Sequence, residues 1–194
     1  CIDRTLDFKP NLTLDDGGGG AATVVSLTHS GTEVLNVSGN VNLIQPGAGQ
    51  TNGWYINGGT GSVTGTLTFT GTNNTAARIQ SIVVTSGSFS VTGAVTWMAN
   101  GGPGTAMPVA TEVITVSTGT VTFGSSLSMP DGSGTLSVTG SGTINFNGAA
   151  APSFNFFNGA ANATEINPVF TTSSGSTLNF LTGLTNSNVA LTIA

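Results

Sequence analysis

Side chains able to carry acid–base or nucleophilic chemistry are scarce in this chain and widely separated. His29 is the single histidine and Cys1 the single cysteine. A Ser-His-Asp site would require His29, a serine and one of few carboxylates to converge, and no motif in the sequence predicts that convergence. His29 precedes a turn signal at Ser30-Gly31, so we expect its imidazole on the surface. We predict that the protein is not an enzyme.

The carboxylates also lack the grouping that catalysis or metal binding needs. Glu112, Asp131 and Glu165 stand alone in separate stretches of the chain, whereas polysaccharide-cleaving enzymes depend on clustered acids for proton transfer. Residues 3–16 contain several aspartates whose oxygens would suit calcium, but their spacing is not that of an EF-hand loop. We expect these acids to be solvated, and we predict no metal and no cofactor.

Aromatic side chains are the remaining candidates for a binding site. Trp54, Tyr55 and Trp97 could present their ring faces to a sugar on an otherwise polar surface. The alternative is that they pack in the core or at its rim. A glycan-binding role for these three residues is therefore kept as an alternative hypothesis.

The composition narrows the class of protein. Only 6% of the 194 residues are charged, against about 25% in an ordinary soluble domain, and the formal net charge is −5. The three basic residues, Arg4, Lys9 and Arg78, form no cluster for binding phosphates, so we predict no nucleic-acid partner. No apolar run reaches the ~18 residues of a membrane-spanning helix. Low surface charge removes the usual repulsion between copies and so favours self-association.

Cys1 opens the sequence with no preceding methionine or signal segment, so we expect a processed chain. An N-terminal cysteine resembles the lipid-acceptor residue of bacterial lipoproteins. Alternatively, cleavage during secretion happens to leave a cysteine at this position. Both interpretations favour an extracellular or cell-surface location, with membrane attachment only if Cys1 is lipidated.

Short runs of strand-forming residues with strict alternation, such as Thr66-Leu67-Thr68-Phe69, predict an all-β protein. A three-residue unit recurs ahead of such runs: an apolar residue, then Ser, Thr or Asn, then glycine. Internal repeats spaced by about 20–50 residues indicate a repeat architecture. Glycine also tolerates the corners of a β-solenoid. We therefore predict a parallel β-solenoid with irregular rungs of about 19–28 residues, a rung being one circuit of the chain. The repeated glycines are Gly39, Gly65, Gly93, Gly119, Gly140, Gly159 and Gly183, with spacings of 26, 28, 26, 21, 19 and 24.

The repeated unit, as in Val63-Thr64-Gly65 before its strand, resembles the β-helical repeat regions of bacterial surface and secreted proteins. Autotransporter passengers and filamentous-haemagglutinin-like adhesins are examples of that class. The resemblance covers about residues 34–180. It implies a parallel β-helix outside the cell and assigns no functional residues.

The alternative fold is an antiparallel β-sandwich or jelly roll of pilin type with donor-strand exchange. Asn-Gly and Asp-Gly pairs are the strongest short-range hairpin signals, and several occur here. Asp131-Gly132 is one of them, and residues 126–138 could form a hairpin around it.

Residues 1–16 differ from the rest of the chain and form an extended, amphipathic strand segment. Residues 17–20 are four glycines that we interpret as a hinge, and residues 21–194 as a single all-β domain. A strand on a hinge can pair with another subunit as a donor strand; alternatively, it folds back and caps its own first rung. The apolar residues predicted to make this contact are Leu6, Phe8, Leu12 and Leu14.

The other end of the sequence is an alternating strand that carries Val189, Leu191 and Ile193. It lacks the charge, proline or polar cap that normally blunts an exposed edge. Two complementary ends predict head-to-tail growth of a homopolymer. We expect a structural subunit of an extracellular self-assembling fibre, pilus-like filament or surface layer. The alternative is an adhesin or carbohydrate-binding module whose partners are surface glycans.

Overall fold

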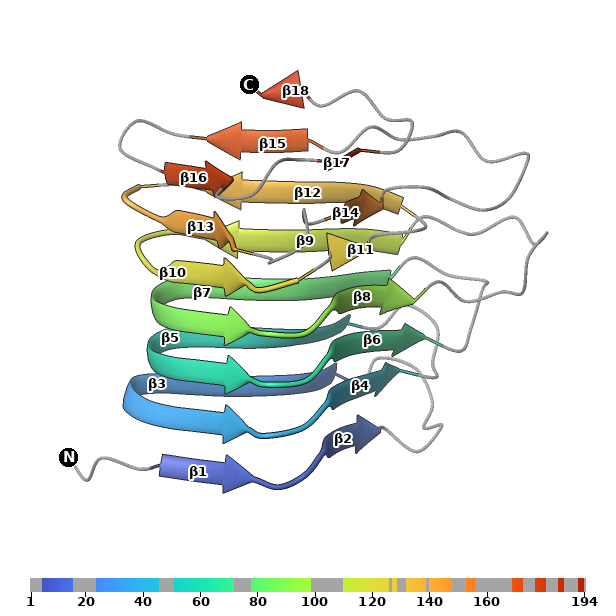
Figure 1. Cartoon of the computed structure of the whole chain (residues 1–194), viewed down its shortest axis with the longest axis vertical. Coiled ribbons are helices and arrows are strands. Elements are labelled where there is room, and N and C mark those ends of the chain that lie inside the picture. The colour runs from blue at the N-terminus through green and yellow to red at the C-terminus, as the bar shows by residue number, and fades with distance from the viewer. Residues whose placement is uncertain are drawn as a thin grey trace.

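The structure is a computed structural model, and it is all-β (Figure 1). Among the residues it describes there is no helix, and therefore none with the length and apolarity to cross a membrane. The described residues are 5–15, 24–45, 51–71, 78–98, 110–125, 127–128, 132–138, 140–147, 153–155, 169–172, 177–180, 185–186 and 192–193.

The strands form two sheets. The eleven-stranded sheet contains β1 (Thr5–Phe8), β3 (Val24–Val37), β5 (Thr51–Val63), β7 (Arg78–Val91), β9 (Ala110–Val116), β10 (Thr120–Phe123), β12 (Gly132–Val138), β13 (Thr143–Phe146), β15 (Val169–Thr172), β16 (Thr177–Phe180) and β18 (Thr192–Ile193). The seven-stranded sheet contains β2 (Leu12–Asp15), β4 (Val41–Gln45), β6 (Leu67–Gly71), β8 (Val95–Met98), β11 (Leu127–Ser128), β14 (Ser153–Asn155) and β17 (Thr185–Asn186).

Every strand pair in the described part of the chain is parallel. This confirms the predicted all-β chain with parallel sheets, an arrangement compatible with a β-solenoid. The antiparallel sandwich was the wrong alternative. Within residues 126–138, for example, β11 and β12 belong to different sheets instead of forming a hairpin. The reason is that turn-favouring pairs such as Asp-Gly mark any sharp change of direction, including one between two sheets.

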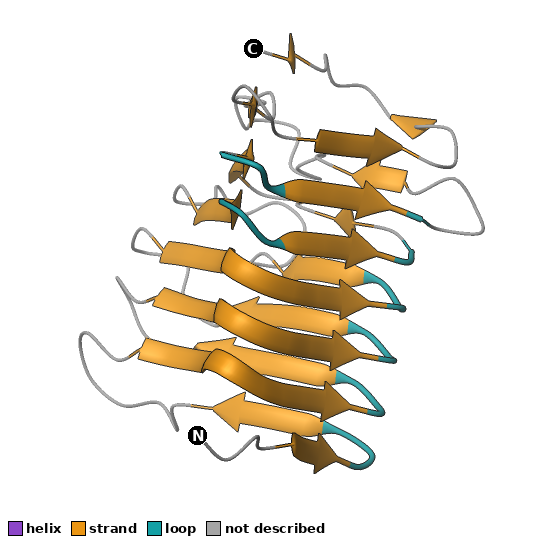
Figure 2. Ribbon diagram, turned by 90° about the vertical axis from the view of Figure 1, so that its left-hand side faces the viewer, coloured by secondary structure: helices purple, strands orange, loops and turns teal. Residues whose placement is uncertain are grey.

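The eleven-stranded sheet has two limbs, because β3, β5 and β7 bend partway along their length (Figure 2). The parts before the bend pair with one another and continue through β9, β12, β15 and β18; we call this the first limb. The parts after the bend pair with β1 at one end and with β10, β13 and β16 at the other; we call this the second limb. In both views the strands lie across the long axis of the molecule and stack along it.

Glycine is required at the bend between the limbs. Gly58 and Gly87 have φ values of 107° and 83°, a conformation that L side chains rarely adopt. A Cβ on Gly87 would also overlap the carbonyl oxygen of Gly59 in the neighbouring strand. Successive bends therefore lie in close contact along the stack.

The glycines of the predicted series lie at two different corners of the stack. This corrects the sequence interpretation, in which they marked one repeated position. Gly39 and Gly65 precede strands of the seven-stranded sheet, and the Gly65 N–H donates to the Gly39 carbonyl at 3.0 Å. Gly119 instead precedes a second-limb strand, and a Cβ there would lie 2.8 Å from the Gly87 carbonyl oxygen. Gly140 also precedes a second-limb strand, β13. The signal fails because every corner of such a stack tolerates glycine, so glycine spacing does not count rungs. Gly159 and Gly183 lie outside the described residues.

The number of residues between register partners also varies over a wider range than the predicted 19–28. Asn145 pairs in register with Thr122, 23 residues earlier, and with Asn179, 34 residues later. The strands keep their alignment while the length of chain between them varies.

The core lies between the two limbs and the seven-stranded sheet. Where side chains are described, they alternate inward and outward along the strands, as in Thr120–Phe123, where every second residue is buried. Because neighbouring strands are in register, inward side chains form columns along the stack. Phe123 and Phe146 are partners in one such column, with ring centroids 5.6 Å apart and planes 24° apart. Fully buried residues from all three walls share this core.

Outward polar side chains form hydrogen-bonded rows along the second limb. The Asn36 amide donates to Asp7 at 2.9 Å, and the Ser62 hydroxyl donates to Asn36 at 2.7 Å. Farther along, the Asn179 amide donates to Asn145 at 2.8 Å. Stacked amides and hydroxyls thus satisfy one another on the outside of the sheet.

Phe69→Ala tests the inward column. Phe69 is fully buried, so its truncation should lower the free energy of unfolding by about 3–5 kcal/mol. The control is Thr68→Ala at the preceding residue, whose side chain lies on the opposite face of the strand; this substitution should cost about 1 kcal/mol or less. Urea unfolding followed by circular dichroism measures both. Equal losses for the two variants would contradict the assigned strand faces.

Candidate functional site

The N-terminal segment is part of the stack of its own chain. β1 pairs with Val34–Val37 of β3, and β2 pairs with β4. The Leu12 N–H donates to the Asn40 carbonyl at 2.9 Å, and the Ser38 N–H donates to the Phe8 carbonyl at 3.0 Å. In this chain residues 5–15 therefore follow the fold-back alternative. Exchange of the segment with a second copy stays a prediction.

Among the described strands, β1 and β2 are the last at this end of their sheets. Each is the terminal strand of its sheet, and no other described strand pairs with its outer edge. Leu6 is in register with buried Leu35 and so belongs to an inward column, yet 54% of its surface is exposed. It is the only large exposed hydrophobic residue among those described.

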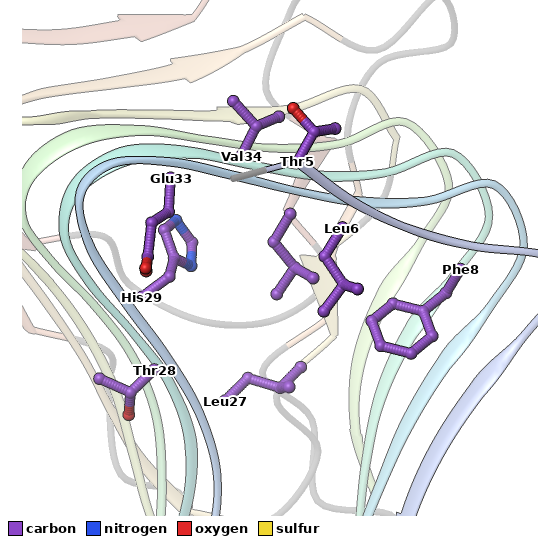
Figure 3. A pocket seen from close by; sticks show the side chains of 9 residues that line it. Thr5, Leu6, Phe8, Leu27, Thr28, His29, Glu33 and Val34 are labelled. Carbon is purple, nitrogen blue, oxygen red and sulfur yellow. The ribbon is translucent and has the colours of Figure 1, made fainter. Parts of the chain in front are cut away.

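A cavity of about 570 Å³ opens between β1 and the neighbouring residues 27–35 of β3 (Figure 3). Figure 3 shows His29 and Glu33 close together on one side and Leu6, Leu27 and Phe8 across from them. The cavity is thus mostly apolar, with two ionisable side chains in its wall. Its lining residues are Thr5, Leu6, Phe8, Leu27, Thr28, His29, Glu33, Val34 and Leu35.

His29 is buried, with 5% of its surface exposed, which corrects the expectation of a surface residue before a turn. The period of a strand explains the error: Val25, Leu27 and His29 are alternate residues of β3 and point to the same inner face. His29 is also in register with Ile56, so an imidazole begins a column that continues with aliphatic side chains. The alternation of Val25, Leu27 and His29 is the sequence signal that indicates the inward position.

Gly61 leaves space for this imidazole. A Cβ at Gly61 would lie 3.0 Å from the His29 Cε1 atom and 3.0 Å from a ring carbon of Phe89. Leu35 and Phe89 flank Gly61 in its inward column. The missing side chain therefore lets two rings lie where a larger residue would crowd them.

The hydrogen bonding of His29 sets its tautomer. The Trp54 Nε1–H donates to His29 Nδ1 at 3.5 Å, a long contact, and within the described structure the buried Nε2 has no partner. Burial lowers the pKa of His29 below its usual 6.5, while the nearby Glu33 carboxylate opposes the shift. The ring is therefore neutral at neutral pH. Because Nδ1 accepts, Nε2 carries the proton and is an unused donor.

The aromatic residues predicted to bind glycans do not form one surface. Trp54 is fully buried and packs against Phe89, with ring centroids 4.7 Å apart. Its exclusion from the surface corrects its assignment as a glycan contact. Tyr55 points to the opposite, outer face, where its hydroxyl accepts a hydrogen bond from Ser81 Oγ at 3.0 Å. Trp97, in β8, is in register with Phe69 of β6, but the side chain of Trp97 lies outside the described residues.

Some of the other residues that the sequence analysis singled out are described by the structure, and some are not. Leu12 is buried and Leu14 and Phe8 are half-buried against the core. Ile193 is in register with Phe170 of β15. Cys1, Asp131, Glu165, Val189 and Leu191 lie outside the described residues, as does the side chain of Glu112. Over the residues that the structure describes, no three His, Cys, Asp or Glu side chains gather as a metal site would require.

Titration of His29 checks its burial. In the unfolded chain His29 protonates near 6.5, whereas in the folded chain its pKa is lower. Between those two values the unfolded chain binds more protons, so the free energy of unfolding should fall as the pH drops below 6.5. The control is His29→Leu, in which this part of the pH dependence should be absent. Urea unfolding at several pH values measures the dependence, and the resonances of the single imidazole report its pKa by NMR.

A folded-state pKa at or above 6.5, or identical pH profiles for wild type and His29→Leu, would contradict the buried, neutral imidazole. Glu33→Gln should lower the pKa of His29 further, because it removes the carboxylate that favours the charged ring.

The resemblance to β-helical regions of bacterial surface proteins stays a prediction. No protein-family model matches this chain. A search of curated proteins and a search of solved structures likewise find no match.

Proposed function

We propose that the chain is a β-solenoid that serves as a structural subunit and grows by stacking copies end to end. The assembly would be an extracellular fibre, a pilus-like filament or a surface layer. The observation that carries this proposal is the pair of outer edges on β1 and β2 that no other described strand covers, together with the exposed Leu6 on β1.

Two physical features favour stacking over solvation of this end. An open strand edge presents unpaired N–H and C=O groups, and natural proteins usually protect such edges with charge, proline or a covering segment. Here an exposed leucine, Leu6, lies at the edge, and the chain as a whole carries few charges to keep copies apart.

The register of the first limb supports a head-to-tail direction. Leu27, at the cavity, starts a row of register partners that passes through Trp54 and the strands beyond it to Phe170 and Ile193 in β18. A preceding copy stacked in the same orientation would continue this row, with its Ile193 next to Leu27. All strands would remain parallel across the junction, and a heterologous contact of this kind forms an open chain of copies.

Leu6→Lys tests this junction. A charge on the edge strand should oppose burial of the cavity rim, so the concentration at which wild-type filaments appear should rise by about tenfold or more in the variant, which corresponds to about 1.4 kcal/mol. Negative-stain electron microscopy and analytical ultracentrifugation over a concentration series measure this threshold.

Thr92→Lys is the matched control, because it adds the same charge at an exposed residue beside the middle strands of the stack. It should assemble like the wild type. A wild-type protein that stays a single copy at every concentration, or a Leu6→Lys variant that assembles unchanged, would contradict the proposal.

A further inference from the structure

We propose that Asp7 controls how readily a second copy joins the N-terminal end, because its carboxylate cannot continue a directional row of hydrogen bonds across the junction. The partner is a second copy of this chain, which meets Asp7 through Asn179 of its β16. This inference rests on the proposed end-to-end stacking and names the residue pair that regulates it.

Asp7 is the first member of an outward row that crosses the whole described part of the second limb. Successive members are in register from β1 to β16, so the row ends at Asp7 on one side and at Asn179 on the other. Asp7 is exposed and Asn179 is partly exposed. The members of the row are Asp7, Asn36, Ser62, Ser90, Thr122, Asn145 and Asn179.

The carboxylate at position 7 fixes the direction of the hydrogen bonds beside it. An ionised carboxylate can only accept, so the Asn36 amide must turn its NH₂ group toward Asp7. Asn36 Nδ2 accordingly donates to Asp7 Oδ1 at 2.9 Å. The Asn36 oxygen is left for the next strand, where it accepts a hydrogen bond from the Ser62 hydroxyl at 2.7 Å. Both donors therefore point toward the N-terminal end of the stack.

The other end of the row has the same direction. Asn179 Nδ2 donates to Asn145 Oδ1 at 2.8 Å, and Asn145 Nδ2 donates to Thr122 Oγ1 at 3.4 Å. An amide that turns its NH₂ group toward one neighbour turns its oxygen toward the opposite side. Asn179 therefore presents an acceptor to the strand that would follow it.

Stacking in the same orientation places the two ends of this row side by side. The Asn179 oxygen of the preceding copy then faces the Asp7 carboxylate, and neither group supplies a proton. Two facing acceptors at a contact that excludes water are both left unsatisfied, which opposes the junction. The neighbouring outward row ends in Thr5 and Thr177. Their hydroxyls can donate or accept, so that row continues without this conflict.

Asp7→Asn tests the missing donor. An asparagine keeps the shape of the side chain, still accepts from Asn36 and offers its NH₂ group to the Asn179 oxygen. The concentration at which filaments appear should therefore fall by about tenfold or more. The matched control is Asp7→Ala, which removes the same charge but adds no donor, so its threshold should stay closer to that of the wild type. Negative-stain electron microscopy and analytical ultracentrifugation over a concentration series measure all three proteins.

A pair of cysteines tests which residues meet. Asp7→Cys and Asn179→Cys are combined with Cys1→Ser, which removes the single native cysteine. The two substituted positions lie at opposite ends of one limb, so a disulfide between them joins two copies. Oxidation at concentrations where the copies stack should give a ladder of covalent oligomers on a non-reducing gel. The control combines Asp7→Cys with Ser90→Cys, in the middle of the row, and should give far less of this ladder.

An Asp7→Asn threshold no lower than that of the wild type or of Asp7→Ala overturns this inference, as does cross-linking no greater than in the control pair. If wild-type filaments form and Leu6→Lys weakens them while Asp7→Asn changes nothing, stacking stands and this inference fails. If the wild type stays a single copy while Asp7→Asn assembles, this inference stands and the proposed role of the chain fails.

Discussion

The parallel, in-register pairing of successive strands is the constraint on which the rest of the structure depends. Because each residue lies beside its register partner, the inner or outer position of one side chain is repeated in the next strand. The inward columns of aliphatic and aromatic residues and the outward rows of amides and hydroxyls both follow from this single rule. The glycines at the bends follow from it too, since the corners must also stack closely.

The same constraint explains why the unusual features gather at one end. In the middle of the stack every strand is covered on both edges, and Ile56 and Val84 there are fully buried. At β1 and β2 the covering strands are missing from the described structure. An inward leucine is consequently half-exposed, and a histidine takes a column position that elsewhere holds an aliphatic residue. The cavity thus lies where the inward columns have no further described strand to cover them.

Local sequence patterns were sufficient to predict the class of fold. Alternation along segments such as Thr66–Phe69 predicted strands, and β-branched polar residues suit the outer face. The order of the corners could not be predicted, because Gly39 and Gly119 each follow a hydroxyl residue and precede an alternating strand but lie at different corners. The position of His29 required knowing that its strand runs on into Gly31 and beyond without leaving the sheet. Glu33 lies beside His29 because β3 bends between the two limbs. The spacing of the two residues in the sequence does not predict that bend.

The orientation of the strands across the long axis (Figure 1) has a mechanical consequence. Hydrogen bonds between neighbouring strands lie roughly along that axis, so a tensile force applied to the two ends loads the bonds of both limbs and of the seven-stranded sheet at the same time. Long strands such as β5 and β7, paired over most of their length, would share such a load among many bonds. β1 and β2, with four residues each, share it among far fewer. β17 and β18 pair over only two described residues each, so rupture under tension would begin at one of the two ends, with the middle of the molecule intact.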